Sequence, residues 1–192
     1  MTKSRCSWCG EDPLYQEYHD REWGVPVTDD ATLFEFLILE TFQAGLSWIT
    51  VLRKREHFRA AFDNFDYKKI AAYDEDKFEE LIQNPGIIRN RLKIRATISN
   101  AQAFMKVQKE FGSFSNYIWG FVDGDPIHNA FKRIDDIPAT TQLSDEISKD
   151  LKKRGFKFVG STVIYAHMQA TGMVNDHVTN CFRYAEVKSL VQ

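Results

Sequence analysis

The sequence predicts an all-α protein. Apolar residues recur at helical spacing through most of the 192 residues, acidic or hydroxyl residues stand where helices would begin, and glycines stand where several would end. The alternation of apolar and polar residues that marks a half-buried strand is nearly absent. Because 43% of the residues are hydrophobic and 14% are aromatic, the chain can bury a substantial core.

Capping residues mark the helices of the first half of the chain. Asp12 precedes Pro13, and an acidic N-cap followed by proline in the first helical position is a typical helix start. Aspartate and serine side chains can accept hydrogen bonds from the free backbone N–H groups of a first turn. The expected helices begin at Pro13, at Asp29 or Asp30, after Ser47, after Asp66 and after Asp74; the second ends near Gly45 and the last ends at Asn84.

Glycines mark the helix ends in the second half. A glycine that follows an amphipathic stretch readily adopts the left-handed conformation that closes a helix. Helices are therefore expected over about 89–111, 144–154 and 161–171, closed by Gly112, Gly155 and Gly172. The stretch 121–141 is rich in proline, glycine and aspartate and is expected to be loop.

The organisation of the chain favours one domain over 1–192, with residues from about 183 to 192 expected to form a flexible tail. No internal repeat, low-complexity segment or flexible linker divides the sequence. No apolar run approaches the roughly 18 residues of a membrane-spanning helix, and the first residues lack the apolar stretch of a secretory signal. We therefore expect a cytoplasmic monomer that does not engage a membrane. The net charge of −2 means that any binding to nucleic acid would depend on local basic patches.

Two pairs of cysteine and histidine lie at opposite ends of the chain, Cys6 with His19 and His177 with Cys181. A structural Zn²⁺ site takes four nitrogen or sulfur ligands, and residues spaced i and i+4 lie on one face of a helical turn. Cys6 and Cys9 also form a C-x2-C pair that would complete a three-cysteine site without His19, so spacing allows either set. Free thiols and a core histidine are the third alternative. An odd number of cysteines disfavours a disulfide framework.

A turn of proline and glycine lies between two amphipathic helices at residues 84–88 (NPGII). This pattern is typical of a helix-hairpin-helix, in which backbone N–H groups beside the positive end of the following helix suit a DNA phosphate. The alternative is an ordinary helical hairpin with a solvated basic surface. No acidic residue occurs from 84 to 95, and two basic runs could support DNA binding: Arg89, Arg91, Lys93 and Arg95, then Lys152, Lys153, Arg154 and Lys157.

Glu40 stands in an otherwise apolar helical stretch, where an unpaired buried carboxylate would be costly. It could cap a neighbouring helix, face solvent at a helix end, or bind a polar or cationic ligand. Aromatic faces stack on nucleobases and attract positive charge. Tyr15, Tyr18 and Trp48 are candidate walls for such a pocket, and their alternative role is that of core residues.

Taken together, these motifs resemble the DNA-3-methyladenine glycosylase I family. The resemblance covers nearly the whole chain and is carried by several motifs in the family's order. They are DPLYQEYHDREWGVP (12–26), QAGLSWITVL (43–52), GIIR (86–89), LKKRGFKFVG (151–160) and VNDH (174–177). The family is similar to other helix-hairpin-helix glycosylases in fold, lacks their catalytic aspartate, and binds zinc through two cysteines and two histidines.

The resemblance implies a role for individual residues of this chain. Cys9 departs from the family pattern, since the family need not have cysteine there. The implied roles are these: Cys6, His19, His177 and Cys181 as ligands of a structural Zn²⁺; Glu40 as the catalytic residue, with Tyr15, Tyr18 and Trp48 in the base pocket; Gly45 and Leu46 as the loop that fills the gap in the duplex; and Gly86, Ile87, Ile88 and Arg89 as DNA-binding residues.

The activity that the resemblance implies is excision of 3-methyladenine from alkylated double-stranded DNA, as a step of base excision repair. Methylation at N3 puts a positive charge on the base and weakens its bond to the sugar, so little acid catalysis is needed. No lysine in a matching motif position supports a Schiff base, and we expect no strand cleavage. The alternatives are a zinc-stapled module that binds alkylated DNA without catalysis, and an iron–sulfur relative, for which three cysteines fall short of the usual four thiolates.

Overall fold

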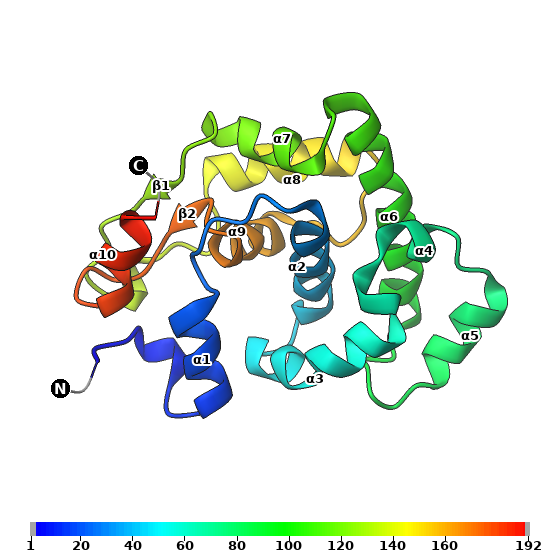
Figure 1. Ribbon diagram of the computed structural model, residues 1–192, viewed down its shortest axis with the longest axis horizontal. Helices are drawn as coiled ribbons and strands as arrows, with labels where there is room; N and C mark the ends of the chain where they lie inside the picture. Colours follow the sequence, from blue (N-terminus) through cyan, green and yellow to red (C-terminus); the bar gives the residue numbers. More distant parts are fainter. Residues whose placement is uncertain (1–2, 191–192) are drawn as a thin grey trace.

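The computed structural model describes residues 3–190, and this part of the chain contains ten α-helices and one pair of two-residue strands (Figure 1). The prediction of a mostly helical protein is confirmed. The helices are α1 Pro13–Arg21, α2 Asp30–Gln43, α3 Trp48–Ala61, α4 Tyr67–Ala71, α5 Glu75–Gln83, α6 Arg91–Phe111, α7 Phe114–Trp119, α8 Gln142–Lys153, α9 Ser161–Ala170 and α10 Phe182–Lys188, and the strands are β1 Ile127–His128 and β2 Val174–Asn175.

The predicted acidic caps are found where the helices begin. The Asp12 carboxylate accepts hydrogen bonds from the backbone N–H groups of Leu14 and Tyr15, at 3.0 and 3.2 Å. The carboxylates of Asp29, Asp66 and Asp74 cap α2, α4 and α5 in the same way. Ser47 differs, because its hydroxyl bonds the Thr50 hydroxyl at 2.7 Å rather than a backbone N–H group.

Two helices lie where none was expected. α7 is short, and its first turn is closed by the Ser113 hydroxyl, which accepts from the N–H of Asn116. α10 occupies most of the stretch expected to be a flexible tail, and residues 191–192 lie outside the described part. The helix is held because Val187 is 1% exposed and the Phe182 N–H donates to the Ser4 carbonyl at 2.9 Å.

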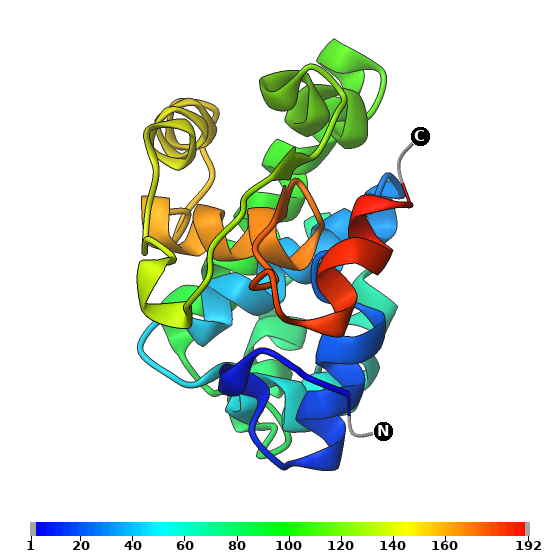
Figure 2. The same cartoon turned by 90° about the vertical axis from the view of Figure 1, so that its left-hand side faces the viewer.

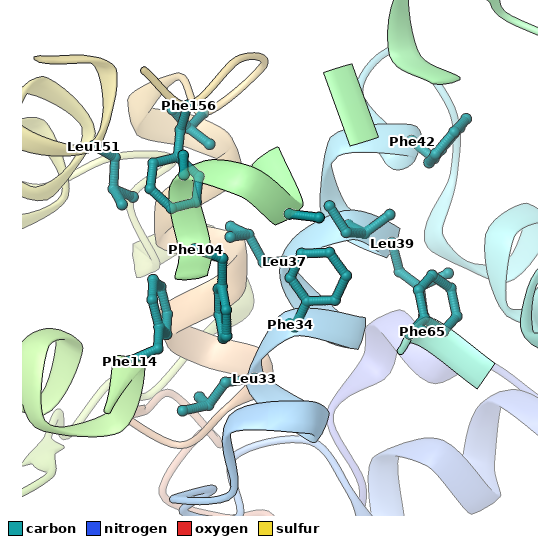
Figure 3. Packing of buried hydrophobic residues seen from close by; sticks show 14 of the residues in the cluster. Leu33, Phe34, Leu37, Leu39, Phe42, Phe65, Phe104, Phe114, Leu151 and Phe156 are labelled. Atoms are coloured by element: carbon teal, nitrogen blue, oxygen red, sulfur yellow. The ribbon is translucent and has the colours of Figure 1, made fainter. Parts of the chain in front are cut away.

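α2 is the buried helix around which the others pack. It lies between α9, α6, α7 and α3, and nine of its fourteen residues are buried. Figure 3 shows Phe34 of α2 beside Phe104 and Phe114, whose rings stack with centroids 4.3 Å apart. A charged side chain on this helix is therefore fixed in position by the core.

The two ends of the chain lie side by side. The segment before α1, α1 itself and α10 form one side of the molecule (Figures 1 and 2). Strand β2, just before the C-terminal helix, pairs in parallel with β1. The stretch 121–141, predicted to be loop, contains the end of a 3-10 helix at Gly120–Val122, strand β1 and a 3-10 helix at Ile134–Asp136, and the rest of it is irregular. Within residues 3–190 every helix is too short or too polar to span a membrane.

Candidate active site and metal site

A cavity of about 330 Å³ brings together the four residues predicted to bind a base. Tyr15 and Tyr18 come from α1, Glu40 from α2 and Trp48 from the first turn of α3. The packing of α1 against α3, and of α3 against α2, sets their positions. The remaining lining residues are Trp8, Trp23, Gln43, Ile134, Ile137, Pro138, Ala166 and Gln169.

The Glu40 side chain is the only carboxylate that lines this cavity among the described residues. Glu40 is 4% exposed, and within residues 3–190 no ion pair or hydrogen bond to its carboxylate is found. Burial alone raises the pKa of Glu40 from 4.5 to about 8. A cation that entered the cavity would favour the ionised form and lower this pKa again.

Aromatic rings form most of the cavity wall. The rings of Tyr18 and Trp48 lie 5.4 Å apart, and Trp8 lies 5.0 Å from both Tyr15 and Trp23. The indole N–H groups of Trp8 and Trp48 are buried and have no hydrogen-bond partner in the described part of the chain. The cavity can therefore hold a flat aromatic ligand between π-faces.

Several lining residues were missed from the sequence. Gln43 lies one helical turn after Glu40, and this i, i+3 spacing was a signal that could have found it. Ile134, Ile137 and Pro138 come from an irregular segment about ninety positions away in the chain, and no local pattern indicates their place.

The loop that joins α2 to α3 is rigidly closed at the edge of the cavity. The Leu46 N–H donates to the Gln43 carbonyl at 2.7 Å, and the Gln43 side-chain amide donates to the Leu46 carbonyl at 2.7 Å. Gly45 has φ +84°, which favours glycine, and Leu46 is 40% exposed. We call residues 44–47 the wedge loop.

Residues 84–90 connect α5 to α6, and we call them the hairpin loop. The Gly86 N–H is already used, since it donates to the Asn84 side chain at 2.8 Å. The N–H groups of Ile87 and Ile88 have no acceptor within residues 3–190. Gly86 is needed for close packing, because a Cβ there would lie 3.2 Å from the His57 side chain. The backbone conformation does not itself require glycine, since the φ of Gly86 is not in the left-handed region. Ile87 is 3% exposed, and its side chain packs in the hydrophobic core.

The basic run after the hairpin loop is less available than the sequence indicated. Arg91 pairs with Glu79 at 2.9 Å, and Arg95 pairs with Glu75 at 2.6 Å. Both acidic residues belong to α5, which lies beside α6, and a sequence run cannot reveal this neighbour. Lys93 is buried. Arg89 is exposed and has no ion pair in the described residues.

The second basic run is also partly neutralised. Arg154 pairs with Asp150 at 2.6 Å and with Glu110 at 2.8 Å. The Asp150 pair lies within one helix turn, whereas Glu110 comes from the end of α6. The local positive field that the sequence predicted is therefore weaker in both places.

Cys6, His19, His177 and Cys181 form one buried cluster that can hold a metal ion. Their ligand atoms all lie within 4.8 Å of one another. The Cys6 and Cys181 sulfurs each lie 3.6 Å from Nδ1 of His177, and the Cys181 sulfur lies 3.5 Å from Nε2 of His19. Cys9 is outside the cluster, because its thiol donates to the Cys6 carbonyl at 3.1 Å.

The hydrogen bonds on the far side of each imidazole indicate which nitrogen faces the cluster. Nδ1 of His19 bonds the Asp20 carboxylate at 2.8 Å, and Nε2 of His177 bonds the Trp23 carbonyl at 2.9 Å. Because each of these acceptors requires a proton on the nitrogen it bonds, the other nitrogen keeps its lone pair. Nδ1 of His177 faces both sulfurs, and Nε2 of His19 faces the Cys181 sulfur while it accepts a hydrogen bond from the Cys6 backbone N–H at 3.2 Å. A bound metal ion would take the place of that hydrogen bond at His19.

Comparison with known proteins agrees with this site. The chain is 52% identical to DNA-3-methyladenine glycosylase 1 of Escherichia coli (strain K12) over 180 residues, 94% of this chain and 96% of the relative. A solved structure of 3-methyladenine DNA glycosylase I (TAG) is similar with a TM-score of 0.91 and 55% identity, over 93% of this chain and 98% of that one.

A second solved structure is a point variant of 3-methyladenine DNA glycosylase I in complex with 3-methyladenine. It is similar with a TM-score of 0.90 and 34% identity, over 93% of this chain and 96% of the other. The family described as methyladenine glycosylase matches residues 8–184. The chain therefore belongs to the methyladenine glycosylase family.

Proposed function

We propose that this protein hydrolyses the bond between 3-methyladenine and its sugar in alkylated double-stranded DNA. The observation that carries the proposal is the buried carboxylate of Glu40, which has no partner among residues 3–190 and lies in a cavity walled by aromatic rings. An aromatic base stacks on such walls, and a base that carries positive charge also offsets the cost of a buried negative charge. The relatives named above act on 3-methyladenine, in agreement with this choice.

The proposed reaction needs little catalytic assistance from the protein. In the reaction, the bond between N9 of the base and C1′ of the sugar breaks, and its electron pair neutralises the positive ring. A water oxygen bonds to C1′ and loses a proton to solvent. Ionised Glu40 would stabilise the cationic base as it enters, and it would stabilise the positive charge that moves to the sugar as the bond breaks. Because the leaving base is neutral, no acid is needed to protonate it.

The same carboxylate accounts for selectivity against ordinary adenine. A neutral base cannot compensate the cost of ionising Glu40 in a site where burial raises its pKa to about 8. Adenine would therefore meet a protonated side chain and lose the electrostatic attraction. Tyr15, Tyr18 and Trp48 supply stacking, which is common to both bases.

Access to the base requires that the nucleotide leave the stack. We assign Gly45 and Leu46 to the gap that the base leaves, since Leu46 is exposed at the edge of the cavity. The N–H groups of Ile87 and Ile88, which have no acceptor in the described part of the chain, are followed by the first turn of α6 and suit a phosphate oxygen. They support a helix-hairpin-helix role, with Arg89 beside them.

The cluster of Cys6, His19, His177 and Cys181 fits a structural Zn²⁺. Two thiolates and two imidazole lone pairs supply four soft or borderline ligands with no position left open for substrate. Bound zinc would supply no step of the reaction. Its role would be to join the N-terminal segment and α1, which carries Tyr15 and Tyr18, to the C-terminal end of the chain.

The test is release of free base. Duplex DNA methylated with dimethyl sulfate is incubated with the protein, and the supernatant is resolved by chromatography. We expect 3-methyladenine to appear without cleavage of the strand. Binding of the methylated duplex with no released base would instead favour a binding module without catalysis, and strand cleavage would contradict the monofunctional reaction.

A further inference from the structure

The wedge loop and the hairpin loop are cross-linked by two lysines in a reciprocal way. Lys93, in the first turn of the helix after the hairpin loop, donates to the carbonyls of Phe42 and Ala44 at 3.0 and 2.9 Å. Lys54, in the helix after the wedge loop, donates to the carbonyls of the hairpin loop at 3.5 and 3.3 Å. Each loop is thus followed by a helix whose lysine holds the other loop.

Lys93 is not placed as an ordinary basic residue of a DNA-binding helix. It is 7% exposed, and no carboxylate lies within ion-pair distance of its amine in the described residues. Burial lowers the pKa of its ammonium group. A buried ammonium is costly unless it is hydrogen-bonded, and here its partners are carbonyls at the negative end of α2. Its charge therefore acts on α2 and the wedge loop rather than on a phosphate.

The carbonyls that Lys93 binds belong to the part of the chain that must meet the lesion. Phe42 follows Glu40 by two residues, and Ala44 begins the wedge loop. Gln43, the last residue of α2, and Leu46 of the wedge loop are already joined by two hydrogen bonds. Lys93 adds the bond that fixes this closed loop relative to the hairpin loop.

We propose that Lys93 is a positioning residue that sets the distance and orientation between the phosphate-binding hairpin loop and the wedge loop, with Lys54 in a weaker supporting contact. The inference rests on the function proposed above. A duplex held at Ile87 and Ile88 then meets Leu46 at a fixed place, before the base has moved. Misplacement of a positioned group by about 1 Å can lower a rate roughly a hundredfold.

The experiment compares substrates that differ in whether the base must be unstacked. Lys93→Met keeps the length and apolar stem but removes the ammonium group. We expect its rate of base release from dimethyl sulfate-methylated duplex DNA to fall roughly ten- to a hundredfold. When the same methylated DNA is denatured and used as single strands, the rate of base release by Lys93→Met should fall much less, since an unpaired base needs little help to leave the stack. Lys54→Met should show the same pattern with a smaller loss.

Lys77→Met is the matched control. Lys77 is a half-buried lysine whose partner is Glu80 on its own helix, and in the described residues its ammonium group has no hydrogen bond to either loop. Its duplex-to-single-strand ratio should equal that of the wild type. Binding of free 3-methyladenine, followed by tryptophan fluorescence, should be unchanged in Lys93→Met, because the cavity walls stay intact. If this variant does not fold, Lys93→Gln, which keeps a donor, is used in its place.

Equal losses on both substrates would overturn the proposal, and so would an unchanged rate on duplex DNA. A wild-type protein that releases no base would contradict the proposed function instead. In that event, the positioning role of Lys93 is tested with a duplex that carries 2-aminopurine, whose fluorescence rises when the base leaves the stack. The wild type should raise the fluorescence of this duplex and Lys93→Met should not. Equal fluorescence with both proteins would overturn the positioning role.

Discussion

At the scale of the residue, Glu40 has two states with different uses. The free protein holds it protonated at neutral pH, because burial raises its pKa to about 8, while recognition of a cation requires the ionised form. We therefore expect kcat/KM on methylated duplex DNA to rise with pH until about pH 8, since this parameter reports the free enzyme.

The control for this profile is Glu40→Gln, which keeps size and one acceptor but cannot ionise. Its activity should be lower by roughly a hundredfold, as for loss of one group that stabilises transition-state charge. Its pH profile should lack the rise towards pH 8. A wild-type profile that is flat from pH 5 to pH 8 would contradict the role of ionised Glu40 in recognising the cationic base.

The same residue predicts an effect on stability. The pKa of Glu40 is higher in the folded protein than the 4.5 of an exposed carboxyl, so the folded state binds the extra proton. Stability from this group is therefore fully present below pH 4.5 and declines as the pH rises through about 8, by at most about 1.4 kcal/mol per pH unit. Urea unfolding of wild type and Glu40→Gln between pH 5 and pH 8 should show the variant gaining relative stability. A constant difference would mean that Glu40 is ionised throughout.

At the scale of the element, the partners of a basic residue decide whether it is available to DNA. Arg89 is unpaired in the described part of the chain, whereas Arg91 is bound to Glu79. Arg89→Ala should weaken duplex binding and reduce the log–log salt slope by about 0.9 for one lost phosphate contact. Arg91→Ala should change the duplex affinity and the salt slope much less. Fluorescence anisotropy over a salt series measures the affinity and the slope. Equal slopes for the wild type and both variants would mean that Arg89 makes no phosphate contact.

The elements that the sequence predicted well are those with a cap. The sequence identified the four capping aspartates because a carboxylate that precedes an apolar helical pattern commonly accepts hydrogen bonds from the N–H groups of the first turn. They are Asp12, Asp29, Asp66 and Asp74. α7 was missed although Ser113 caps it, because six residues give too short a pattern to distinguish a helix from an apolar loop. The pairing of Arg91 and Arg95 with α5 could not be predicted, since it depends on which helices become neighbours.

The candidate site was predictable to the extent that its residues are local in sequence. Glu40 was singled out as a carboxylate in an apolar helical stretch, and Tyr15 and Tyr18 as aromatic walls, both with the support of the family resemblance; the three residues line one cavity. The wall at Ile134 and Pro138 depends on the path of an irregular segment, and the lysine cross-links depend on two loops meeting. Neither leaves a pattern in the sequence.

At the scale of the whole molecule, the cluster of two cysteines and two histidines joins residues that are up to 175 positions apart, from Cys6 to Cys181. Closing so long a loop in the unfolded chain is entropically costly, so a bound ion contributes strongly to the folded state. Elemental analysis should give about one zinc per chain, as for a four-ligand structural site. Removal with a chelator should lower the melting temperature by more than an ordinary surface substitution, which changes stability by about 0.5 kcal/mol or less. A metal-free protein of unchanged stability would contradict this.

The ligand set is tested by a pair of variants. Cys9→Ser should keep the metal, because the Cys9 thiol bonds a backbone carbonyl outside the cluster. His19→Ala should lose it. The opposite result would restore the arrangement of three cysteines and one histidine. Zinc content by mass spectrometry of the native protein distinguishes the two.

The same cluster has a consequence for how the protein is made. On the ribosome, Cys6 and His19 are made early, and His177, the first of their partners, follows His19 by 158 residues. On every shorter nascent chain α1, with Tyr15 and Tyr18, would have its packing against α3 but not its link to residues 177–181. We expect that a product of premature termination cannot complete the cavity, so that a broken synthesis yields no partial enzyme able to probe bases in the genome.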